Sequence, residues 1–213
     1  MLLILTVVVV ALGLGFALGG RLSGFEGFRL RWWALGPVGL AMQLLPVPFE
    51  GEAGDVARVA LLIGSYVALF AFAAVNLRAP GVPLILLGLA MNFLVIAVNT
   101  GMPVSRDALV ATDQEEAIAA LDEVGIAKHH LASDDDVLLF LADVIPIGGP
   151  FDQVVSAGDL AIYAGVVWLV VGIMRRPTPE TEPARPPGRS GPRRGRHRRA
   201  RRPRTPMPSG TEP

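Results

Sequence analysis

The chain has 213 residues, of which 52% are apolar and 18% are charged, and its formal net charge is zero. Together with a mean hydropathy of +0.49, this composition is typical of a multipass membrane protein rather than a soluble globular domain. Cysteine is absent, which excludes disulfide bonds, thiolate metal sites and cysteine nucleophiles.

Long apolar runs occur five times, at about residues 1–20, 32–49, 56–77, 82–100 and 157–174. Each run has about 17–22 residues, which at 1.5 Å per residue crosses a hydrocarbon core of about 30 Å. The first lacks the basic region and cleavage site of a secretory signal, so we expect a retained helix. The second contains Pro37, Pro46 and Pro48 and should be kinked or unwound at its far end. We therefore predict an all-α integral membrane bundle of five transmembrane helices within residues 1–174.

Charged residues distinguish the two ends of these runs. One end carries the basic side chains Arg21, Arg29, Arg31 and Arg78 and the twelve arginines of residues 175–213. The other end carries the acidic side chains Glu50, Glu52 and Asp55 and most of the twelve acidic residues of segment 101–159. By the positive-inside rule we expect a multipass plasma-membrane protein with its N-terminus outside and its C-terminus in the cytoplasm.

The fourth run, within residues 81–105, is interrupted by Asn92 and Asn99. Seven residues make nearly two helical turns, so both amides lie on one face, about 20° apart. A side-chain amide in hydrocarbon needs partners, and we expect both to face the bundle interior. Interhelical hydrogen bonding is a sufficient role for either residue. Asn99, nearer the outer surface, is the better candidate for contact with a ligand beneath the outer loop, and Asn92 is expected to be a packing residue.

The outer loop, residues 101–156, is expected to be helical. Three hydroxyl residues followed after three positions by a carboxylate predict capping boxes: Thr112 with Glu115, Ser133 with Asp136, and Ser156 with Asp159. The first of these helices should end at Gly125. Residues 137–145 are too apolar for water and too short to cross, so we expect an interfacial or re-entrant helix that stops at Pro146. Helix capping is a sufficient role for Asp159.

Two histidines and one carboxylate in this loop are candidates for a site. His129 and His130 could bind a divalent metal with nearby carboxylates, but adjacent residues point about 100° apart on a helix and no metal-site spacing is present. We therefore predict no metal and no cofactor. Asp143 lies in an apolar stretch and needs a basic partner, such as Lys128, Arg106 or a histidine, unless it faces water.

The last segment, residues 175–213, is rich in arginine and proline and lacks apolar residues that could form a core. We expect a disordered cytoplasmic tail. Clustered arginines can neutralise nucleic-acid phosphates, but the segment has no aromatic residue for base stacking, and it follows directly on a membrane span. We therefore expect the lipid bilayer and the anionic lipids of its inner leaflet as partners, and not nucleic acid; no protein partner is indicated.

Four motifs occur in order: N-T-G-M-P-V, K-H-H-L, F-L-A-D-V-I-P and S-A-G-D-L-A-I. With the five-span plan, this set resembles the bacterial membrane family known as domain of unknown function 5317, over roughly residues 1–174. The resemblance implies motif positions at Asn99, Gly101, Met102, Pro103, His129, Asp143, Pro146, Gly158 and Asp159. The family has no assigned activity, so the resemblance implies a fold and a set of positions only.

No phosphate-binding glycine loop, serine-hydrolase elbow or zinc-protease motif occurs in the sequence. We therefore favour a non-catalytic membrane protein whose outer loop caps the bundle around four side chains and binds a ligand or partner: Asn99, His129, Asp143 and Asp159. Two alternatives stay open. In one, Asp143 and His129 form an acid/base or ion-binding pair of a membrane enzyme or small-solute transporter. In the other, the protein is a membrane scaffold that acts through its basic tail.

Overall fold

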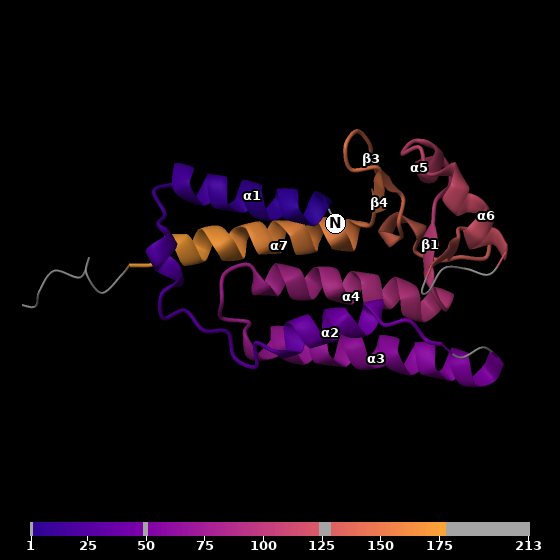
Figure 1. The fold of residues 1–213 in the computed structure, drawn as a ribbon, viewed down its shortest axis with the longest axis horizontal. Helices are drawn as coiled ribbons and strands as arrows, with labels where there is room; N and C mark the ends of the chain where they lie inside the picture. The colour runs from indigo at the N-terminus through magenta and orange to yellow at the C-terminus, as the bar shows by residue number, and fades with distance from the viewer. Residues whose placement is uncertain (1, 49–50, 124–128, 178–213) are drawn as a thin grey trace, which may run out of the picture. The chain divides into compact units, whose positions relative to one another are not determined.

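A computed structural model describes residues 2–48, 51–123 and 129–177, which form one compact unit. The described chain is mostly helical. Five helices build a bundle: α1 (Leu2–Ala17), α2 (Leu35–Leu44), α3 (Gly51–Val75), α4 (Val82–Asn99) and α7 (Ala157–Met174). Helix α7 packs against both α1 and α4, α4 also packs against α3, and α3 packs against α2 (Figure 1). Residues 178–213 and the expected disordered tail within them lie outside the described residues.

Three helices, α3, α4 and α7, are long and apolar enough to cross a membrane, whereas α1 and α2 are shorter apolar helices. The fourth and fifth apolar runs form helices almost at the predicted residues. Helix α3 begins earlier than predicted, at Gly51, because carboxylates such as Glu52 are stabilised in a first helical turn. Helix α2 is shorter than predicted and ends at Leu44, because Pro46 and Pro48 cannot continue it.

Helices α4 and α7 are in direct backbone contact along two pairs of glycines. A Cβ atom added at Gly88 would overlap the carbonyl oxygen of Gly158, and one added at Gly81 would overlap that of Gly165. Gly81 immediately precedes α4 and lies seven residues before Gly88, and Gly158 and Gly165 have the same spacing on one face of α7. Small residues at a helix interface let the two backbones approach closely, and here they bring α4 and α7 together as an antiparallel pair.

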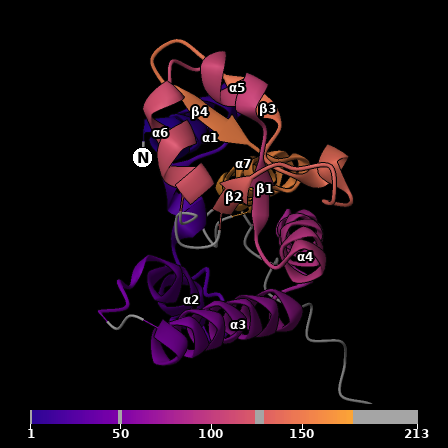
Figure 2. The ribbon, with the colours of Figure 1, turned by 90° about the vertical axis from the view of Figure 1, so that its right-hand side faces the viewer.

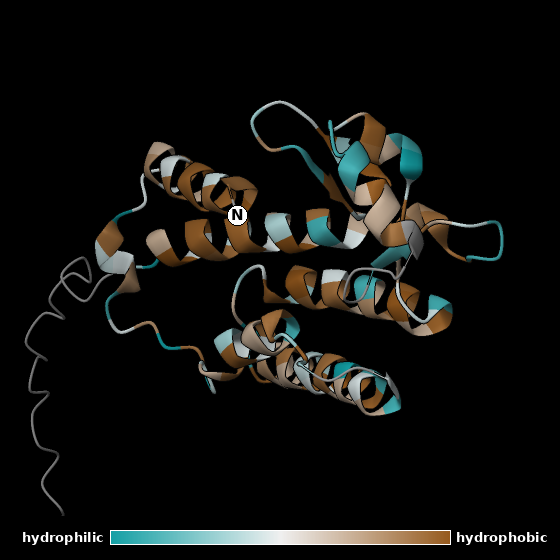
Figure 3. Ribbon diagram, turned by 45° about the vertical axis from the view of Figure 1, so that its right-hand side comes forward, coloured by the Kyte–Doolittle hydropathy of each residue, from teal (hydrophilic) through white to brown (hydrophobic). Residues whose placement is uncertain are grey.

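Large apolar side chains remain exposed along the outer faces of the bundle helices. Examples are Leu5 in α1, Leu40 in α2, Val67 in α3, Leu87 in α4 and Trp168 in α7. Figure 3 shows hydrophobic residues along all of these helices, with polar residues concentrated at the end that carries the strands. A soluble protein rarely exposes apolar surface on this scale, and the surface suits contact with lipid.

The segment between α4 and α7 folds into a cap at one end of these two helices (Figure 2). It contains two short helices, α5 (Arg106–Val110) and α6 (Glu115–Glu123), one 3-10 turn, η2 (Leu139–Leu141), and four short strands: β1 (Met102–Val104), β2 (His129–Leu131), β3 (Ile145–Ile147) and β4 (Gln153–Val155). Strands β1 and β2 are parallel, with α5 and α6 in the connection between them, and β3 and β4 form an antiparallel pair. The described chain is mostly helical, as expected, but the outer loop combines short helices with short strands, so the prediction of a helical outer loop holds only in part.

The helix predicted over residues 137–145 is absent. Leu138 has a left-handed backbone with φ of 59°, and only the three residues of η2 that follow are helical. The backbone of Asp143 then pairs with β1 instead: its N–H donates to Pro103 O at 3.1 Å, and its carbonyl accepts from Ser105 N–H at 2.9 Å. Pro146 consequently lies in a strand and does not stop a helix.

The predicted capping boxes have different outcomes. The box of Ser156 with Asp159 at the start of α7 is confirmed. The box of Thr112 with Glu115 is wrong, because the Thr112 hydroxyl donates backwards to carbonyl oxygens of α5, at 3.0 Å and 3.1 Å. The Ser133–Asp136 hydrogen bonds form, at 2.8 Å and 3.1 Å, but no α-helix follows them. Gly125, the predicted helix end, lies outside the described residues.

One hydrophobic cluster joins the cap to the bundle. Its buried members come from three elements of the bundle and cap and from the turn after η2: Tyr66, Leu69, Leu89, Val95, Ile96, Met102 and Ala142. The rings of Tyr66, Phe70 and Phe93 pack around it with centroids 4.9–5.9 Å apart. Because Met102 and Ala142 are 3% and 0% exposed, the cap is packed against the bundle and is not a loose loop.

Candidate functional site

Three polar side chains join α4 to the first turn of α7. The Asn92 amide donates to Asp159 Oδ1 at 2.8 Å and accepts from the Ser156 hydroxyl at 2.9 Å. Asp159 and Ser156 exchange two further hydrogen bonds, in which the Asp159 N–H and the Ser156 N–H are the donors. Asn92 and Ser156 are 8% and 0% exposed, so this closed ring lies inside the protein. Gly158 is part of the arrangement, because any side chain there would overlap the Asn92 amide.

The side chain of Asn99 connects the end of α4 to the cap through hydrogen bonds. Its amide donates to Val137 O at 2.9 Å, and its carbonyl oxygen accepts from Val137 N–H at 2.9 Å. The same amide also donates to Val95 O at 3.0 Å within α4. The side chain thus imitates a peptide group and holds the segment that leads into η2. Asn99 and Asn92 have separate hydrogen-bond partners, although they lie on one face of the helix.

The motif after Asn99 builds the central strand of the cap. Gly101 N–H donates to Ile96 O at 3.0 Å and closes the end of α4. Met102 and Pro103 are buried in β1, which lies between β2 on one side and the backbone of Asp143 on the other. This arrangement brings together residues about 25 to 40 positions apart in the sequence. The family-motif residues in this region therefore support the cap.

His129 and Asp143 meet at one edge of this strand. Their side chains approach to 3.5 Å between Nε2 and Oδ2, and the exposed fractions are 34% and 11%. Both residues line a small hollow of about 180 Å³ with Gln114 and five apolar residues: Val104, Leu109, Ala117, Leu121 and Val154. The predicted basic partner of Asp143 is thus a histidine, and the hollow offers a carboxylate, an imidazole and an amide within an apolar wall.

His130 faces a different carboxylate. Its Nε2 lies 2.9 Å from Asp136 Oδ1, and the side chain of Asp136 is 7% exposed. Burial raises the pKa of the Asp136 carboxyl, but hydrogen bonds from the Ser133 backbone, His130 and the Ser133 hydroxyl outweigh burial and hold its pKa below the ordinary value. Because His129 and His130 pair with separate carboxylates, the two adjacent histidines do not converge on one point. Among the described residues, no three such side chains form a candidate metal cluster.

Acidification is expected to loosen the segment that Asp136 holds. A carboxyl whose pKa is lowered by folding stabilises the fold fully above its ordinary value, here 3.8, and this contribution is lost as the pH falls through the folded pKa below it. The protection of residues 129–141 from hydrogen exchange, relative to the intrinsic exchange rate at each pH, should therefore fall below about pH 4. The Asp136→Asn variant should exchange faster at neutral pH and lose this acid-dependent component. Asp135→Asn, an exposed neighbour, is the control, and identical pH profiles for wild type and Asp136→Asn would contradict the assignment.

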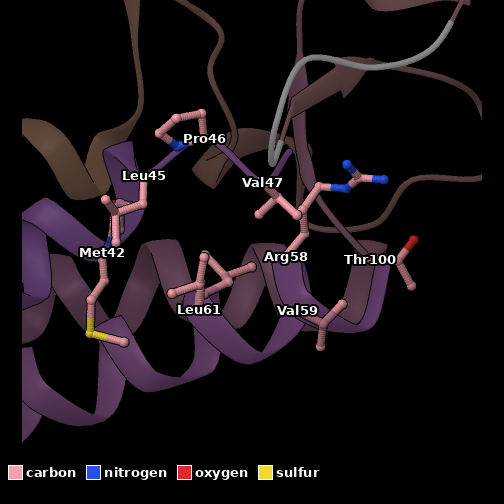
Figure 4. A pocket seen from close by; sticks show the side chains of 10 residues that line it. Met42, Leu45, Pro46, Val47, Arg58, Val59, Leu61 and Thr100 are labelled. Carbon is pink, nitrogen blue, oxygen red and sulfur yellow. The ribbon is translucent and has the colours of Figure 1, made fainter. Parts of the chain in front are cut away.

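A second hollow, of about 320 Å³, lies at the same end of the bundle between α2 and α3 (Figure 4). Most of its lining is apolar, and the polar residues are Gln43, Arg58 and Thr100. Arg58 pairs with Asp55 on its own helix at 2.6 Å, and Gln43 donates to the Ser65 hydroxyl at 3.1 Å. The lining contains no acidic residue and no histidine.

The structure thus divides the predicted site residues into three groups. His129 and Asp143 lie together, Asp159 lies with Asn92 and Ser156, and Asn99 binds Val137. The expected interhelical hydrogen bonding of Asn92 is confirmed, and its partners lie 64 and 67 residues further along the chain. A signal for this contact was present in the sequence, because Gly81 and Gly88 at the start of α4 have the same spacing of seven as Gly158 and Gly165 in α7. Gln114, the third polar group of the smaller hollow, had no sequence signal.

Comparison with known proteins agrees with the predicted resemblance. An uncharacterized protein of Thermotoga maritima is 31% identical over 129 residues, which make up 59% of this chain and 70% of the relative. No solved structure matches the chain. Residues 27–171, about two thirds of the chain, match a family described as "Family of unknown function (DUF5317)". The chain therefore belongs to the DUF5317 family.

Proposed function

We propose that this chain is a five-pass protein of the plasma membrane, with its N-terminus outside and its C-terminus in the cytoplasm. Helices α3, α4 and α7 supply three apolar spans, and α1 and α2 pack beside them with exposed apolar side chains. Helix α1 is about 24 Å long at 1.5 Å per residue. The ten residues of α2 and the extended chain up to Pro48 together reach a similar length.

Charge supports the same orientation. The link from α1 to α2, the link from α3 to α4 and the end of α7 lie at one end of the bundle and carry six arginines: Arg21, Arg29, Arg31, Arg78, Arg175 and Arg176. The acidic cap lies at the other end, where α4 ends and α7 begins (Figure 1). By the positive-inside rule, the arginine-rich end belongs in the cytoplasm and the cap outside.

Single cysteines introduced into this cysteine-free chain test the topology. In intact cells, a membrane-impermeant maleimide should label Glu52→Cys and Asp134→Cys, which lie at the cap end. Glu26→Cys and Leu77→Cys should be labelled only after lysis, because they lie in the links at the opposite end. All four positions are solvent-exposed, so accessibility to the reagent is matched. Labelling of Glu26→Cys in intact cells would contradict a five-pass topology in this orientation.

For the cap, we propose a non-catalytic role in binding a small ligand. The observation that carries this proposal is the hollow of about 180 Å³ with His129 and Asp143 in its wall. This volume is below the usual range of about 300–1,000 Å³ for pockets that bind drug-sized molecules. A largely apolar wall with one carboxylate suits a small organic molecule that carries a hydrogen-bond donor or a positive charge.

Complementation of a strain that lacks the gene tests this role. His129→Gln combined with Asp143→Leu should abolish complementation, because both polar groups of the hollow are lost. Asp134→Asn combined with Asp135→Asn changes two exposed carboxylates of the cap that do not line the hollow, and it is the control. Expression and membrane insertion of each variant are checked by immunoblot. Full complementation by the first pair would remove the reason to regard the hollow as a site.

A membrane enzyme or small-solute transporter is the second candidate function. The 3.5 Å approach of His129 to Asp143 favours it, because a proton-transfer or ion-binding pair requires side chains within hydrogen-bond reach or nearly so. The Asp143→Asn variant separates the two candidates. An amide retains the shape and much of the hydrogen bonding of a carboxylate but cannot take up a proton. Complementation by Asp143→Asn but not Asp143→Leu would support binding through hydrogen bonds and contradict acid/base chemistry, whereas failure of both would show that the negative charge of Asp143 is required, for acid/base chemistry or for a cationic ligand.

A further inference from the structure

The end of the bundle opposite the cap contains a pocket of about 370 Å³. Three separate parts of the chain line it: the link between α1 and α2, the turn between α3 and α4, and the end of α7. Each part contributes arginine, and the four side chains are Arg29, Arg31, Arg78 and Arg176. The lining contains no acidic residue.

Asn76 fixes the position of this link. Its side-chain oxygen accepts from the Arg31 N–H at 2.8 Å, and its amide nitrogen donates to the Arg31 carbonyl at 2.8 Å. The same nitrogen donates to Phe72 O at 2.7 Å, so this buried amide is anchored to α3 as well. The Arg31 backbone is therefore held against Asn76 at the end of α3. Asn76 is two residues before Arg78 in the sequence. The hydrogen bonds between Asn76 and Arg31 therefore fix this side of the pocket.

Arg176 is also held in place. Its guanidinium lies 5.1 Å from the centre of the Phe28 ring, within the range of a cation–π contact. Its backbone N–H donates to Ile173 O at 3.1 Å in the last turn of α7. This contact connects the end of α7 to the link between α1 and α2 and leaves the donor edge of the guanidinium available for hydrogen bonds.

The four guanidinium groups lack a carboxylate partner within the part of the chain that the structure describes. The ion pairs found there are Arg58–Asp55, His129–Asp143 and His130–Asp136, all at the cap end of the molecule. Four arginines that line one pocket carry like charges, so binding of an anion among them is electrostatically favourable. Guanidinium groups match the geometry of phosphate oxygens with two parallel hydrogen bonds, which makes phosphate the best-fitting anion.

The surroundings of the pocket indicate where such a phosphate comes from. Leu30, Val75 and Pro80 add apolar surface beside the arginines. Next to Arg31, Trp32 and Trp33 are 58% and 70% exposed, as expected of tryptophans in the headgroup layer of a bilayer. A basic pocket between helix ends at the cytoplasmic face is a known arrangement for anionic headgroups.

We propose that this pocket binds the phosphate-bearing headgroup of an anionic lipid of the inner leaflet. The site lies at the opposite end of the molecule from the cap and is independent of the ligand proposed there. It is also distinct from the arginines of residues 177–213, since every side chain that forms it belongs to the folded part of the chain. A lipid bound here would connect the link between α1 and α2, the turn between α3 and α4, and the end of α7 at the membrane surface.

Lipid retention by the full-length protein tests the proposal. The protein is reconstituted in nanodiscs of phosphatidylcholine with or without phosphatidylglycerol, and retained lipids are counted by native mass spectrometry after release. The R31Q/R78Q variant should bind phosphatidylglycerol roughly tenfold or more weakly than wild type. R21Q/R175Q removes the same charge from exposed arginines at the same end that do not line the pocket, and it should retain the lipid. R31K/R78K should recover part of the affinity, because lysine keeps the charge but not the planar fork.

The remaining arms separate the possible outcomes. If millimolar glycerol 3-phosphate fails to displace the bound lipid, the result supports a lipid site. If glycerol 3-phosphate itself binds in phosphatidylcholine nanodiscs without anionic lipid, the pocket is a site for a soluble phosphate ester, and the lipid assignment is overturned. Equal loss in R31Q/R78Q and R21Q/R175Q, or no loss in either, shows that general surface charge holds the lipid and overturns the pocket. If R31Q/R78Q does not fold, the single variants R78Q and R175Q are compared by the same criterion.

Discussion

The Gly88→Val variant is expected to be less stable than the wild-type protein by about 3 kcal/mol. A Cβ atom at Gly88 would overlap the Gly158 carbonyl oxygen and lie 2.7 Å from Ile162 Cγ1 and 3.0 Å from the Ile162 backbone nitrogen. Two of these neighbours are backbone atoms, which cannot rotate away, so α4 and α7 would have to separate. The separation would also strain the ring of Asn92, one turn further along α4. Unfolding of the purified protein in mixed micelles with increasing dodecyl sulfate measures the loss.

Gly13→Val in α1 is the matched control for this prediction. It introduces the same β-branched side chain at a helical glycine, but a Cβ atom at Gly13 would have no atom within 4 Å apart from the neighbouring backbone of its own helix. Intrinsic helix propensity therefore changes equally in the two variants, and only the helix–helix contact differs. A Gly88→Val protein no less stable than Gly13→Val would show that α4 and α7 do not pack through their glycines.

The Asn92→Leu variant is expected to lower the free energy of unfolding by about 2 kcal/mol. The substitution removes both hydrogen bonds of the amide and leaves Asp159 Oδ1 and the Ser156 hydroxyl without their α4 partner at a buried position. Interhelical hydrogen bonds in membrane proteins contribute about 0.6 kcal/mol on average and about 1.7 kcal/mol at most. Here two are lost together, and one of the acceptors is a carboxylate.

A double-mutant cycle of Asn92→Leu with Ser156→Ala separates the pairwise contribution from general disturbance. We expect a coupling energy of about 1 kcal/mol, because the two side chains share a hydrogen bond of 2.9 Å. The Asn99→Leu variant is the control on the same helix face. It should release the segment around Val137 to proteolysis and leave the α4–α7 contact intact. Zero coupling between Asn92 and Ser156 would contradict the buried ring.

The difference between Asn92 and Asn99 illustrates why the site was only partly predictable. Helical periodicity correctly places both amides on one face of α4, and hydrocarbon chemistry correctly requires partners for them. The partner of each amide cannot be identified from neighbouring residues in the sequence. Asn92 meets the start of α7, and Asn99 meets a backbone segment of the cap 38 residues away. Only the packed structure decides which residue joins two helices and which holds the cap.

The cap shows the same limit for secondary structure. Ser133 with Asp136 forms the predicted local hydrogen bonds, but the chain that follows is pinned by Asn99 at Val137 and by β1 at Asp143. These contacts compete with the helical hydrogen bonds that residues 137–145 would otherwise make, and they replace them. Strands of three residues are too short for an alternating pattern to be recognised in the sequence.

Features that depend on neighbouring residues or on composition follow from the amino-acid sequence alone. These are the apolar helices, the segregation of charge between the ends, the Ser156–Asp159 cap of α7 and the family resemblance. The tertiary structure alone decided which distant groups meet: the ring around Asn92, the His129–Asp143 pair and the four arginines of the basic pocket. The physical reason is the distance along the sequence over which each kind of interaction acts. Hydropathy and helix capping act within a few residues, whereas a site formed by side chains from several elements exists only once packing has brought those elements together.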